Sequence, residues 1–384
     1  MRNVTDSLIR IFVQVPLMVS VLFRLFHPPK DYILIISPTY FGRDSVVGGG
    51  ERYPIELAKA LACQKKVRFV SFGNNNEHSS VGRVDAVVYK PHFPFHKNLY
   101  HPFNFSLVRD IWSAEVVQCA QYRTLTTLFS LGIAKLFGKK TFVSDYGYGS
   151  NKAYLHWFHV WVNTFLLLSR FGTKMISAPS LKKKVVWGGV DIRRFTPIPF
   201  SQKKNYFLCV GRIMPHKGID VIVRAIQDEE LIIIGTVYHE GYYQVLRKMA
   251  KGKKVTFFTN VEDRDLVRFY QEARASVLSS VRKDFYGTVQ IQPELFGLVL
   301  LESMASGTPV IASKVGGIPE VVRDQKDGIL IDPGDVRQMR RAIQSMYQDR
   351  ALWEDRSKEM RHHIEVTYSW PAIARKYLDY YEKA

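Results

Sequence analysis

Two glutamates flank the start of a predicted helix near residue 300. Glu294 and Glu302 lie eight positions apart, and the apolar run after Gly297 predicts a helix that stops at Ser306-Gly307, where glycine suits the residue beyond a helix end. A helix entered from a glycine loop presents unpaired N–H groups and a partial positive charge, which suits a phosphate. One glutamate can then face the head of a ligand while the other reaches further along it. The residues of this helix start are Phe296, Gly297, Leu298 and Val299.

Two cations follow a predicted strand earlier in the chain. Tyr206–Val210 reads as a short buried strand, and Arg212 and Lys217 lie in the loop that follows it. Open α/β sheets bind their ligands at the carboxyl ends of such strands. Two cations in this place can hold a diphosphate and neutralise the charge on a departing nucleotide. Arg212 and Lys217 are therefore candidate phosphate ligands.

In their context these residues resemble a known enzyme family. The segment around the glutamates reads PELFGLVLLESMASGTPVIA, GGIPE follows it, and the cation loop reads GRIMPHKG. The first resembles the E-x7-E motif of the retaining glycosyltransferases of family 4, and the loop resembles their G-R-x-x-x-x-K-G motif. The resemblance covers the chain from about Asp31 onward. It implies an α/β protein with the GT-B fold, in which two doubly wound Rossmann-like domains face each other across a cleft.

The resemblance also implies a reaction. A hexose would move from a nucleotide diphosphate sugar, either a UDP-sugar or a GDP-sugar, to an acceptor hydroxyl with retention at the anomeric carbon. Arg212 and Lys217 would bind the diphosphate. Glu294 would hold the sugar hydroxyls, and Glu302 would bind the ribose. No cofactor is implied, and no motif such as D-x-D stands out as a metal-bound donor site, so we expect a metal-independent enzyme.

Two loops of the amino-terminal half are predicted to reach the same ligand. Gly49 and Gly50 belong to a Gly-Gly-Gly-Glu-Arg run between a strand and a helix, and this run resembles the family's GG-x-E-R loop, which faces the donor diphosphate or the acceptor. Asp145 directly follows another strand end and can bind a sugar hydroxyl. Tyr146 stands where many relatives carry a histidine that approaches the donor sugar, which is a departure from the family pattern.

Apolar runs that alternate with helical patterns predict two doubly wound parallel sheets. The strands expected in the first half are Asp31–Ser37, Val67–Ser71, Val84–Tyr89, Glu115–Cys119, Lys140–Ser144 and Lys174–Ala178. Those expected in the second half are Tyr206–Val210, Leu231–Gly235, Val255–Phe258, Ala275–Ser279 and Val310–Ala312. Between the two sets, aromatic residues at helical spacing predict a helix within residues 155–168.

These elements divide into three parts. Residues 1–30 are an amino-terminal amphipathic segment outside the resemblance. Residues 31–195, with a returning helix over residues 368–384, are expected to form an amino-terminal Rossmann-like acceptor domain. Residues 196–367 are expected to form a carboxy-terminal Rossmann-like nucleotide-sugar-binding domain, and the polar, proline-containing stretch Thr196–Lys204 is the expected linker.

Charge and cysteine content limit the partners and the compartment. The formal net charge is +19, and residues 1–190 hold 24 Lys/Arg against 10 Asp/Glu. A basic half indicates an anionic partner. No nucleic-acid-binding signature is present, so we expect a membrane surface rather than nucleic acid. Cys63, Cys119 and Cys209 are far apart in apolar runs, which favours buried, reduced thiols in the cytoplasm.

The segment at residues 8–26 is the candidate membrane contact. On a helix its polar residues share one narrow stripe, Arg10 and Arg24 bracket too short an apolar run for a comfortable span, and Pro16 interrupts it. A helix in the plane of an anionic membrane fits this pattern, while a helix packed on the protein and a transmembrane anchor stay open. We therefore expect peripheral association with the inner face of a membrane and a lipid-linked or glycan acceptor. The loop Pro91–Phe105, dense in aromatic and basic residues, suits a headgroup contact, an acceptor groove or a local cap.

Two other functions stay open. A membrane-docked sugar-nucleotide-binding protein with little or no turnover would keep Arg212 and Lys217, and would be disabled by Tyr146. A sugar-nucleotide epimerase of the same fold is a third possibility, but the Glu294/Glu302 pair argues against it. Hydrolysis or transfer across a panel of donor sugars separates these alternatives.

Overall fold

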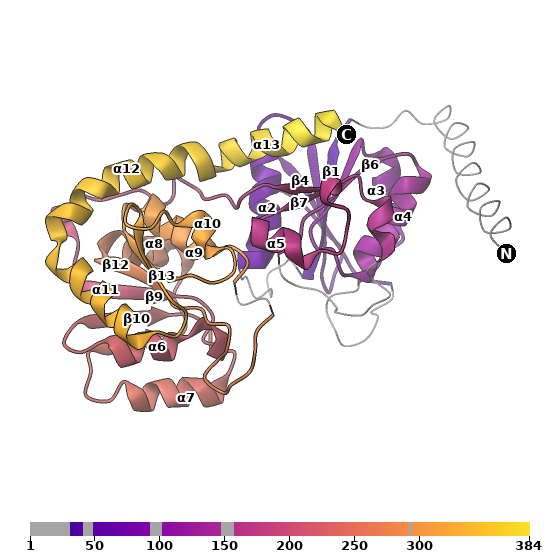
Figure 1. Cartoon of the computed structure of the whole chain (residues 1–384). Helices are drawn as coiled ribbons and strands as arrows, with labels where there is room; N and C mark the ends of the chain where they lie inside the picture. Colours follow the sequence, from indigo (N-terminus) through magenta and orange to yellow (C-terminus); the bar gives the residue numbers. More distant parts are fainter. Residues whose placement is uncertain (1–30, 41–48, 93–101, 147–156, 292–293) are drawn as a thin grey trace. The chain divides into compact units, whose positions relative to one another are not determined.

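The computed structural model (Figure 1) describes residues 31–40, 49–92, 102–146, 157–291 and 294–384. They form two compact α/β units. The amino-terminal unit takes the described residues within Met1–Leu168, Thr173–Val186 and Ala374–Ala384. The carboxy-terminal unit takes the described residues within Ser169–Gly172 and Trp187–Ile373.

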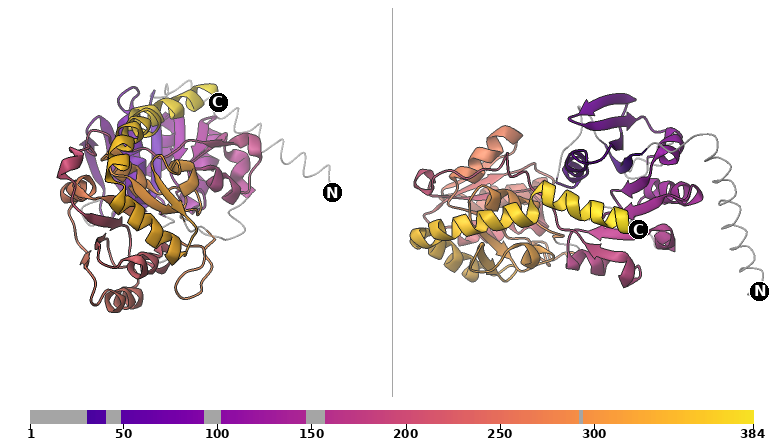
Figure 2. Two further views of the ribbon diagram at one scale, coloured as in Figure 1. Left: turned by 60° about the vertical axis from the view of Figure 1, so that its left-hand side comes forward. Right: turned by 90° about the horizontal axis from the view of Figure 1, so that it is seen from above.

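The amino-terminal unit is built on an eight-stranded sheet with the strand order β3-β4-β2-β1-β5-β6-β7-β8. The strands are β1 Ile33–Tyr40, β2 Val67–Phe72, β3 Glu77–Val81, β4 Val84–Tyr89, β5 Val116–Cys119, β6 Lys140–Val143, β7 Thr164–Leu167 and β8 Lys183–Val185. All neighbours pair in parallel except β3 and β4, which form an antiparallel hairpin at the sheet edge (Figure 2). The central strand β1 is buried along Ile33–Ile36, as expected for a strand covered on both faces.

Helices cover both faces of this sheet. They are α2 Gly49–Leu61, α3 Ser106–Ser113, α4 Leu125–Leu136, η2 Trp157–Trp161, α5 Arg170–Met175, η3 Ser180–Lys182 and α13 Trp370–Lys383. The helix α4 begins where the Thr124 side chain accepts a hydrogen bond from the Thr127 N–H at 3.1 Å, which is a capping contact. At the chain's end, Tyr381 of α13 donates to Gln118 Oε1 of β5 at 3.1 Å, so the last helix is held to the amino-terminal sheet.

The carboxy-terminal unit is built on a six-stranded parallel sheet with the order β11-β10-β9-β12-β13-β14. Its strands are β9 Tyr206–Val210, β10 Glu230–Ile234, β11 Val255–Phe258, β12 Ala275–Leu278, β13 Val310–Ser313 and β14 Gly328–Ile331. Its helices are η4 Phe200–Gln202, η5 Pro215–Lys217, α6 Ile219–Ala225, α7 Glu240–Met249, α8 Asp263–Glu272, α9 Leu298–Ala305, α10 Ile318–Val321, α11 Val336–Gln348 and α12 Arg350–Tyr368. The helices α6, α7 and α11 pack together, and α8 and α12 pack on α9. The strand order places β9 and β12 side by side at the centre.

The structure confirms most of the predicted strands and corrects two elements. Lys174–Ala178 is not a strand, because α5 occupies Arg170–Met175. The helix expected within residues 155–168 is wrong in its second half, where β7 runs over Thr164–Leu167. Phe165 is fully buried in that strand, and a short apolar run suits a buried strand as well as a helix.

Three side chains lie in different surroundings from those expected. Cys63 is exposed near the end of α2, whereas Cys119 and Cys209 are buried as predicted. Phe200 is only 7% exposed and belongs to the hydrophobic core of the carboxy-terminal unit, although it lies in the expected linker. Nearby, the buried Lys203 donates to the Gln271 carbonyl at 2.7 Å, and burial lowers the pKa of Lys203 to about 7.

The predicted membrane contacts lie largely outside the described residues. These are the segment at residues 8–26 and most of the loop Pro91–Phe105. Within the part of the chain that the structure describes, no helix has the length and apolar character needed to cross a bilayer.

Candidate functional site

The centre of the candidate site is an ion pair between Lys217 and Glu294. Lys217 ends η5, in the loop after β9, and Glu294 lies in the loop after the neighbouring strand β12. The Lys217 Nζ lies 2.6 Å from Glu294 Oε2, and each side chain is 15% exposed. The Ser280 hydroxyl donates to the same carboxylate oxygen at 3.3 Å. The adjacent strand ends thus bring together two residues predicted to bind one ligand.

This environment keeps Glu294 ionised. Burial raises the pKa of a carboxyl group, but the charge and hydrogen bond of Lys217 outweigh it, with smaller contributions from His216 and Ser280, so the pKa of Glu294 lies below its usual value. An ammonium group has three hydrogen-bond donors, so Lys217 can hold a second acceptor besides Glu294. The pair can therefore join a sugar hydroxyl and a phosphate.

The loop that follows β13 holds the backbone of Glu294 in place. The Gly317 N–H donates to the Glu294 carbonyl at 3.1 Å. Gly316 has a φ of +60°, and a Cβ added there would lie 1.7 Å from the same carbonyl oxygen. No residue with a side chain fits that space. The Gly-Gly pair of the GGIPE segment therefore works as a close backbone support for Glu294.

The start of α9 has the form expected of an anion site. Gly297 precedes the helix with a φ of +88°, and no side chain caps it. Unpaired N–H groups in the first turn suit a negative ligand. The Phe296 ring is 2% exposed and lies 6.2 Å from the Tyr368 ring, measured between centroids. Among the predicted residues here, Phe296 can thus offer only its backbone, whereas Leu298 and Val299 are half-buried.

Glu302 lies in the second turn of the same helix. Its Oε2 accepts a hydrogen bond from the Tyr270 hydroxyl of α8 at 2.9 Å. Tyr270 is fully buried and Glu302 is half-buried. The carboxylate is therefore held at a defined place on the helix, and its predicted ribose contact stays a prediction.

Arg212 shares its loop with Lys217. The Arg212 guanidinium carbon lies 5.3 Å from the centre of the Tyr238 ring, an arrangement that favours a cation–π contact. Between the two cations in sequence lies His216, whose pKa responds to the charges of Lys217, Glu294 and Arg212. Both predicted phosphate ligands therefore lie in one loop at the carboxyl end of β9, and Lys217 of that loop contacts Glu294.

The remaining predicted residues lie in the amino-terminal unit. Gly49 and Gly50 begin α2, and Asp145 follows β6. Tyr53 of α2 and Tyr146 have ring centroids 4.6 Å apart, so this helix and the Asp145 loop meet. Tyr146 is 8% exposed, and its ring is part of the packing. Tyr146, which is predicted to stand where the resembled family carries a histidine, is thus a buried residue.

Three residues around the site escaped the sequence analysis. Ser280 donates to Glu294, His216 lies between the two cations, and Tyr238 lies under Arg212. The sequence could have indicated Ser280 as a site residue, because it closely follows the end of β12 and ligands bind at the carboxyl ends of such strands. Tyr238 could not be indicated in this way, since its contact with Arg212 is made only by the fold.

The position of His216 next to Lys217 leads to a test of how stability depends on pH. Burial and the charge of Lys217 lower the pKa of His216 to about 4, against about 6.5 in an unfolded chain. Between these values the unfolded chain binds a proton that the folded chain does not, so stability falls as the pH drops from 6.5 towards 4. The variant His216→Gln is expected to flatten this slope. Urea unfolding at pH 7, 6 and 5 measures it.

The control for His216→Gln is a histidine outside the site. His362 of α12 is exposed, and His362→Gln is expected to retain the wild-type slope. The depressed pKa of Glu294 acts in the same direction, but only at pH values below its usual range near 4.5. Equal slopes for the wild type and His216→Gln would contradict a neutral, half-buried His216.

No metal site stands out. Among the described residues, no three His, Cys, Asp or Glu side chains gather as metal ligands would. The predicted metal independence stays a prediction.

Comparisons with known proteins bear on the same half of the chain. Residues 192–364 match the family described as glycosyl transferases group 1. The chain is 31% identical over 180 residues to a D-inositol 3-phosphate glycosyltransferase of Mycobacterium sp. (strain KMS), which is 42% of this chain and 38% of that protein. It is 30% identical over 237 residues to a GDP-mannose-dependent alpha-(1-6)-phosphatidylinositol monomannoside mannosyltransferase of Mycobacterium tuberculosis (strain H37Rv), 55% of this chain and 58% of that protein. The chain thus spans about half the length of the curated relatives it matches, or less.

Solved structures match nearly the whole chain. Sucrose-phosphate synthase from Thermosynechococcus elongatus aligns with a TM-score of 0.72 at 19% identity, over 92% of this chain and 99% of that one. A glycosyltransferase from Rickettsia africae aligns with a TM-score of 0.68 at 16% identity, over 93% and 99% of the two chains. The predicted fold class is therefore confirmed: the chain has the two-domain α/β fold of GT-B glycosyltransferases.

Proposed function

We propose, from the match of residues 192–364 to group 1 glycosyl transferases, that this chain is a retaining glycosyltransferase. It moves a hexose from a nucleotide diphosphate sugar to an acceptor hydroxyl. The observation that carries the proposal is the Lys217–Glu294 pair, 2.6 Å apart, beside the uncapped start of α9. One partner suits a phosphate, and the other suits a sugar hydroxyl.

In this proposal each group acts on a different part of the donor. The bond between the anomeric carbon and the diphosphate oxygen breaks, and the acceptor oxygen forms the new bond on the same face. The acceptor proton passes to the departing diphosphate. Lys217, Arg212 and the N–H groups of α9 stabilise the charge on that diphosphate, where each donor contributes about 3 kcal/mol. Glu294 and Asp145 hold sugar hydroxyls, and Glu302 binds the ribose.

The proposed donor is a UDP-sugar or a GDP-sugar, and the proposed acceptor is lipid-linked. A relative named as a mannosyltransferase uses GDP-mannose and acts on a phosphatidylinositol mannoside, and a protein of the same fold was solved with UDP and glucose. We extend these substrate classes to this chain. Cytoplasmic, peripheral membrane association through the amphipathic segment at residues 8–26 belongs to the same proposal.

A nucleotide screen tests the proposal. Thermal unfolding with UDP, GDP, ADP and their sugars should show one base that raises the Tm, since a ligand at 100 times its Kd stabilises by about 2.7 kcal/mol. The variant Arg212→Gln is expected to lose most of this rise. A matched control is Arg247→Gln, because Arg247 also lies over a tyrosine ring, 5.8 Å from the centre of Tyr243, but on the exposed side of α7.

Two results would count against the proposal. If the Tm stays the same with every nucleotide, the proposed donor site is contradicted. A nucleotide that binds without any hydrolysis or transfer across the donor panel would instead favour the second candidate, a membrane-docked sugar-nucleotide-binding protein. That candidate is supported by the absence of the family's histidine at Tyr146, which is buried against Tyr53.

A further inference from the structure

A tyrosine of the neighbouring helix holds Glu302 from the side of the core. Tyr270 lies in α8, which packs on α9 (Figure 1), and its hydroxyl donates to Glu302 Oε2 at 2.9 Å. The Tyr270 ring is fully buried, whereas Glu302 is half-buried. The carboxylate is therefore tied to the core at one oxygen and lies at the edge of the solvent.

This contact suits a carboxylate that also binds hydroxyl groups of a ligand. An ionised carboxylate only accepts hydrogen bonds and has about four lone-pair positions, so Glu302 can accept other donors besides Tyr270. Hydrogen bonds to a charged acceptor are shorter and stronger than those between neutral groups. The bond from Tyr270 thus restricts the side-chain torsions of Glu302, and a ligand hydroxyl meets an acceptor that is already oriented.

Other contacts fix Tyr270 in turn. Its ring meets the Phe195 ring edge to face, with the centroids 5.8 Å apart, and its backbone carbonyl accepts from the Thr308 hydroxyl at 2.6 Å. The buried Lys203 supports the same place, since its Nζ donates to Thr308 Oγ1 at 2.5 Å and to the Gln271 carbonyl at 2.7 Å. The end of α8 is therefore attached to the segment that precedes β9 and to the segment that follows α9.

A second tyrosine makes the same kind of bond to α8, but to the backbone. The Tyr206 hydroxyl donates to the Phe269 carbonyl at 2.9 Å, and Tyr206 is buried. This bond attaches β9 to α8 through a backbone carbonyl that already belongs to the helix. The Tyr270 bond differs in its acceptor, which is a charged side chain on the helix whose start is the predicted phosphate site. Of the two tyrosines, only Tyr270 acts on a group predicted to bind the ligand.

We infer that Tyr270 is a positioning residue that sets the preference of this site for a ribose over a sugar without ribose hydroxyls. It holds the Glu302 carboxylate in the orientation that accepts from the ribose hydroxyls of the donor nucleotide. The inference rests on the proposed function, in which Glu302 binds the ribose, and it names a residue that gives this contact its specificity. Tyr270 itself touches no part of the donor in this arrangement.

Titration calorimetry on the full chain tests the inference without any transfer reaction. The probes are UDP and GDP, each beside its 2′,3′-dideoxy form, which lacks both ribose hydroxyls. The wild type is expected to bind the ribose form of one base about 100-fold more tightly, because two hydrogen bonds to a charged group are lost together. Tyr270→Phe should reduce this preference about tenfold and leave the affinity for the dideoxy form unchanged. Glu302→Gln should reduce it at least as much, and adding Tyr270→Phe to Glu302→Gln should reduce it no further.

The matched control is Tyr206→Phe. It also removes a hydroxyl group from a buried ring that bonds to α8 at 2.9 Å, so it should keep the wild-type preference for the ribose form. If Tyr270→Phe also keeps that preference, or weakens the ribose and dideoxy forms equally, Tyr270 has only a structural role and the inference is wrong. Equal losses of preference in Tyr270→Phe and Tyr206→Phe would likewise overturn it.

A measurement without nucleotide separates this inference from the proposed function. Urea unfolding of the wild type, Tyr270→Phe, Glu302→Gln and the double variant should give coupled losses, because the two single substitutions remove one shared hydrogen bond. Additive losses would contradict the action of Tyr270 on Glu302. A wild type that binds neither form of either base would overturn the proposed donor site. Failure of the inference alone looks different, since the wild type then prefers the ribose form and Tyr270→Phe prefers it equally.

Discussion

Replacing Lys217 with alanine is expected to lower hexose transfer about 100-fold or more, with the protein still folded. In the proposed reaction, the substitution removes a cation that stabilises the departing diphosphate. It also leaves Glu294 without the group 2.6 Å away that keeps its pKa low, so the carboxylate loses both its charge partner and its orientation. The value of kcat/KM for the donor found in the nucleotide screen measures the effect.

The control is a cation of the same unit that is paired away from the site. Arg264 of α8 lies 2.8 Å from Glu262, with side chains 79% and 68% exposed, and Arg264→Ala should transfer normally, because an exposed pair contributes little. Near-normal turnover by folded Lys217→Ala would remove Lys217 from the mechanism. Equal losses in both variants would point to a general effect on stability.

Gly316→Ala is the second substitution with a large expected effect, and it acts on the backbone rather than on charge. Alanine would require a φ near +60° and would bring its Cβ to 1.7 Å from the Glu294 carbonyl oxygen. The loop must then move, which releases the support of Glu294. We expect a loss of about 3 kcal/mol in the free energy of unfolding together with a loss of transfer. Urea unfolding and kcat/KM measure the two effects.

The control variant Gly334→Ala separates the effect of the Cβ collision from the effect of a positive φ. Gly334 has a φ of +82°, but a Cβ added there would meet nothing within 4 Å. Gly334→Ala should therefore cost only the left-handed conformation, about 1 kcal/mol, and leave transfer intact. Equal stability of the two variants would show that the contact between Gly316 and Glu294 is not needed.

The Lys217–Glu294 pair also explains how two charges are tolerated in a largely buried place. Two charges that are each 15% exposed would be costly to bury alone, but as a pair they satisfy one another. A donor diphosphate can share the ammonium group, because the pair uses only one of its three donors. This sharing distinguishes the site from surface pairs such as that of Arg264 and Glu262, where the arginine side chain is 79% exposed.

Local patterns in the sequence determined many of the secondary-structure elements. The apolar runs of β9 and β13 and both ends of α9 could be predicted because strand burial, glycine entry and glycine exit are properties of neighbouring residues. The same reasoning failed at residues 155–168 and 174–178. A run of four to eight apolar residues fits a helix or a strand, and only the surrounding sheet decides which.

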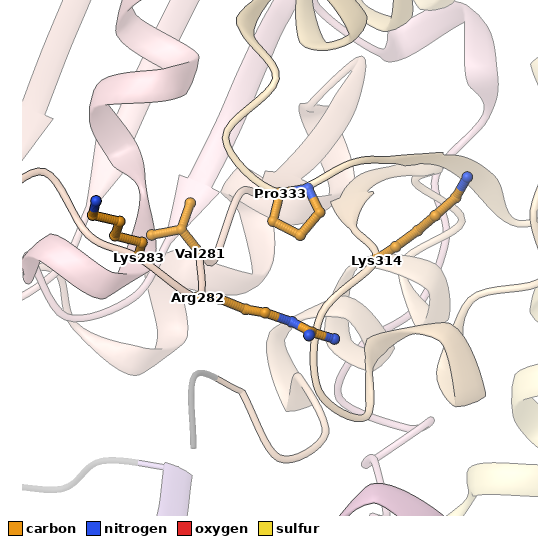
Figure 3. A pocket seen from close by; sticks show the side chains of 5 residues that line it. All are labelled: Val281, Arg282, Lys283, Lys314 and Pro333. Atoms are coloured by element: carbon orange, nitrogen blue, oxygen red, sulfur yellow. The ribbon is translucent and has the colours of Figure 1, made fainter. Parts of the chain in front are cut away.

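Only the tertiary structure decided which of the predicted residues meet. Lys217 and Glu294 are 77 positions apart, and Tyr270 and Glu302 are 32 apart. These contacts exist because β12 lies next to β9 and α8 next to α9. The pocket lined by Val281, Lys314 and Pro333 (Figure 3) likewise depends on three loops that come together because β12, β13 and β14 are adjacent. Spacing in the sequence can identify a charged side chain as a candidate. The order in which the strands pair then decides which side chain it contacts.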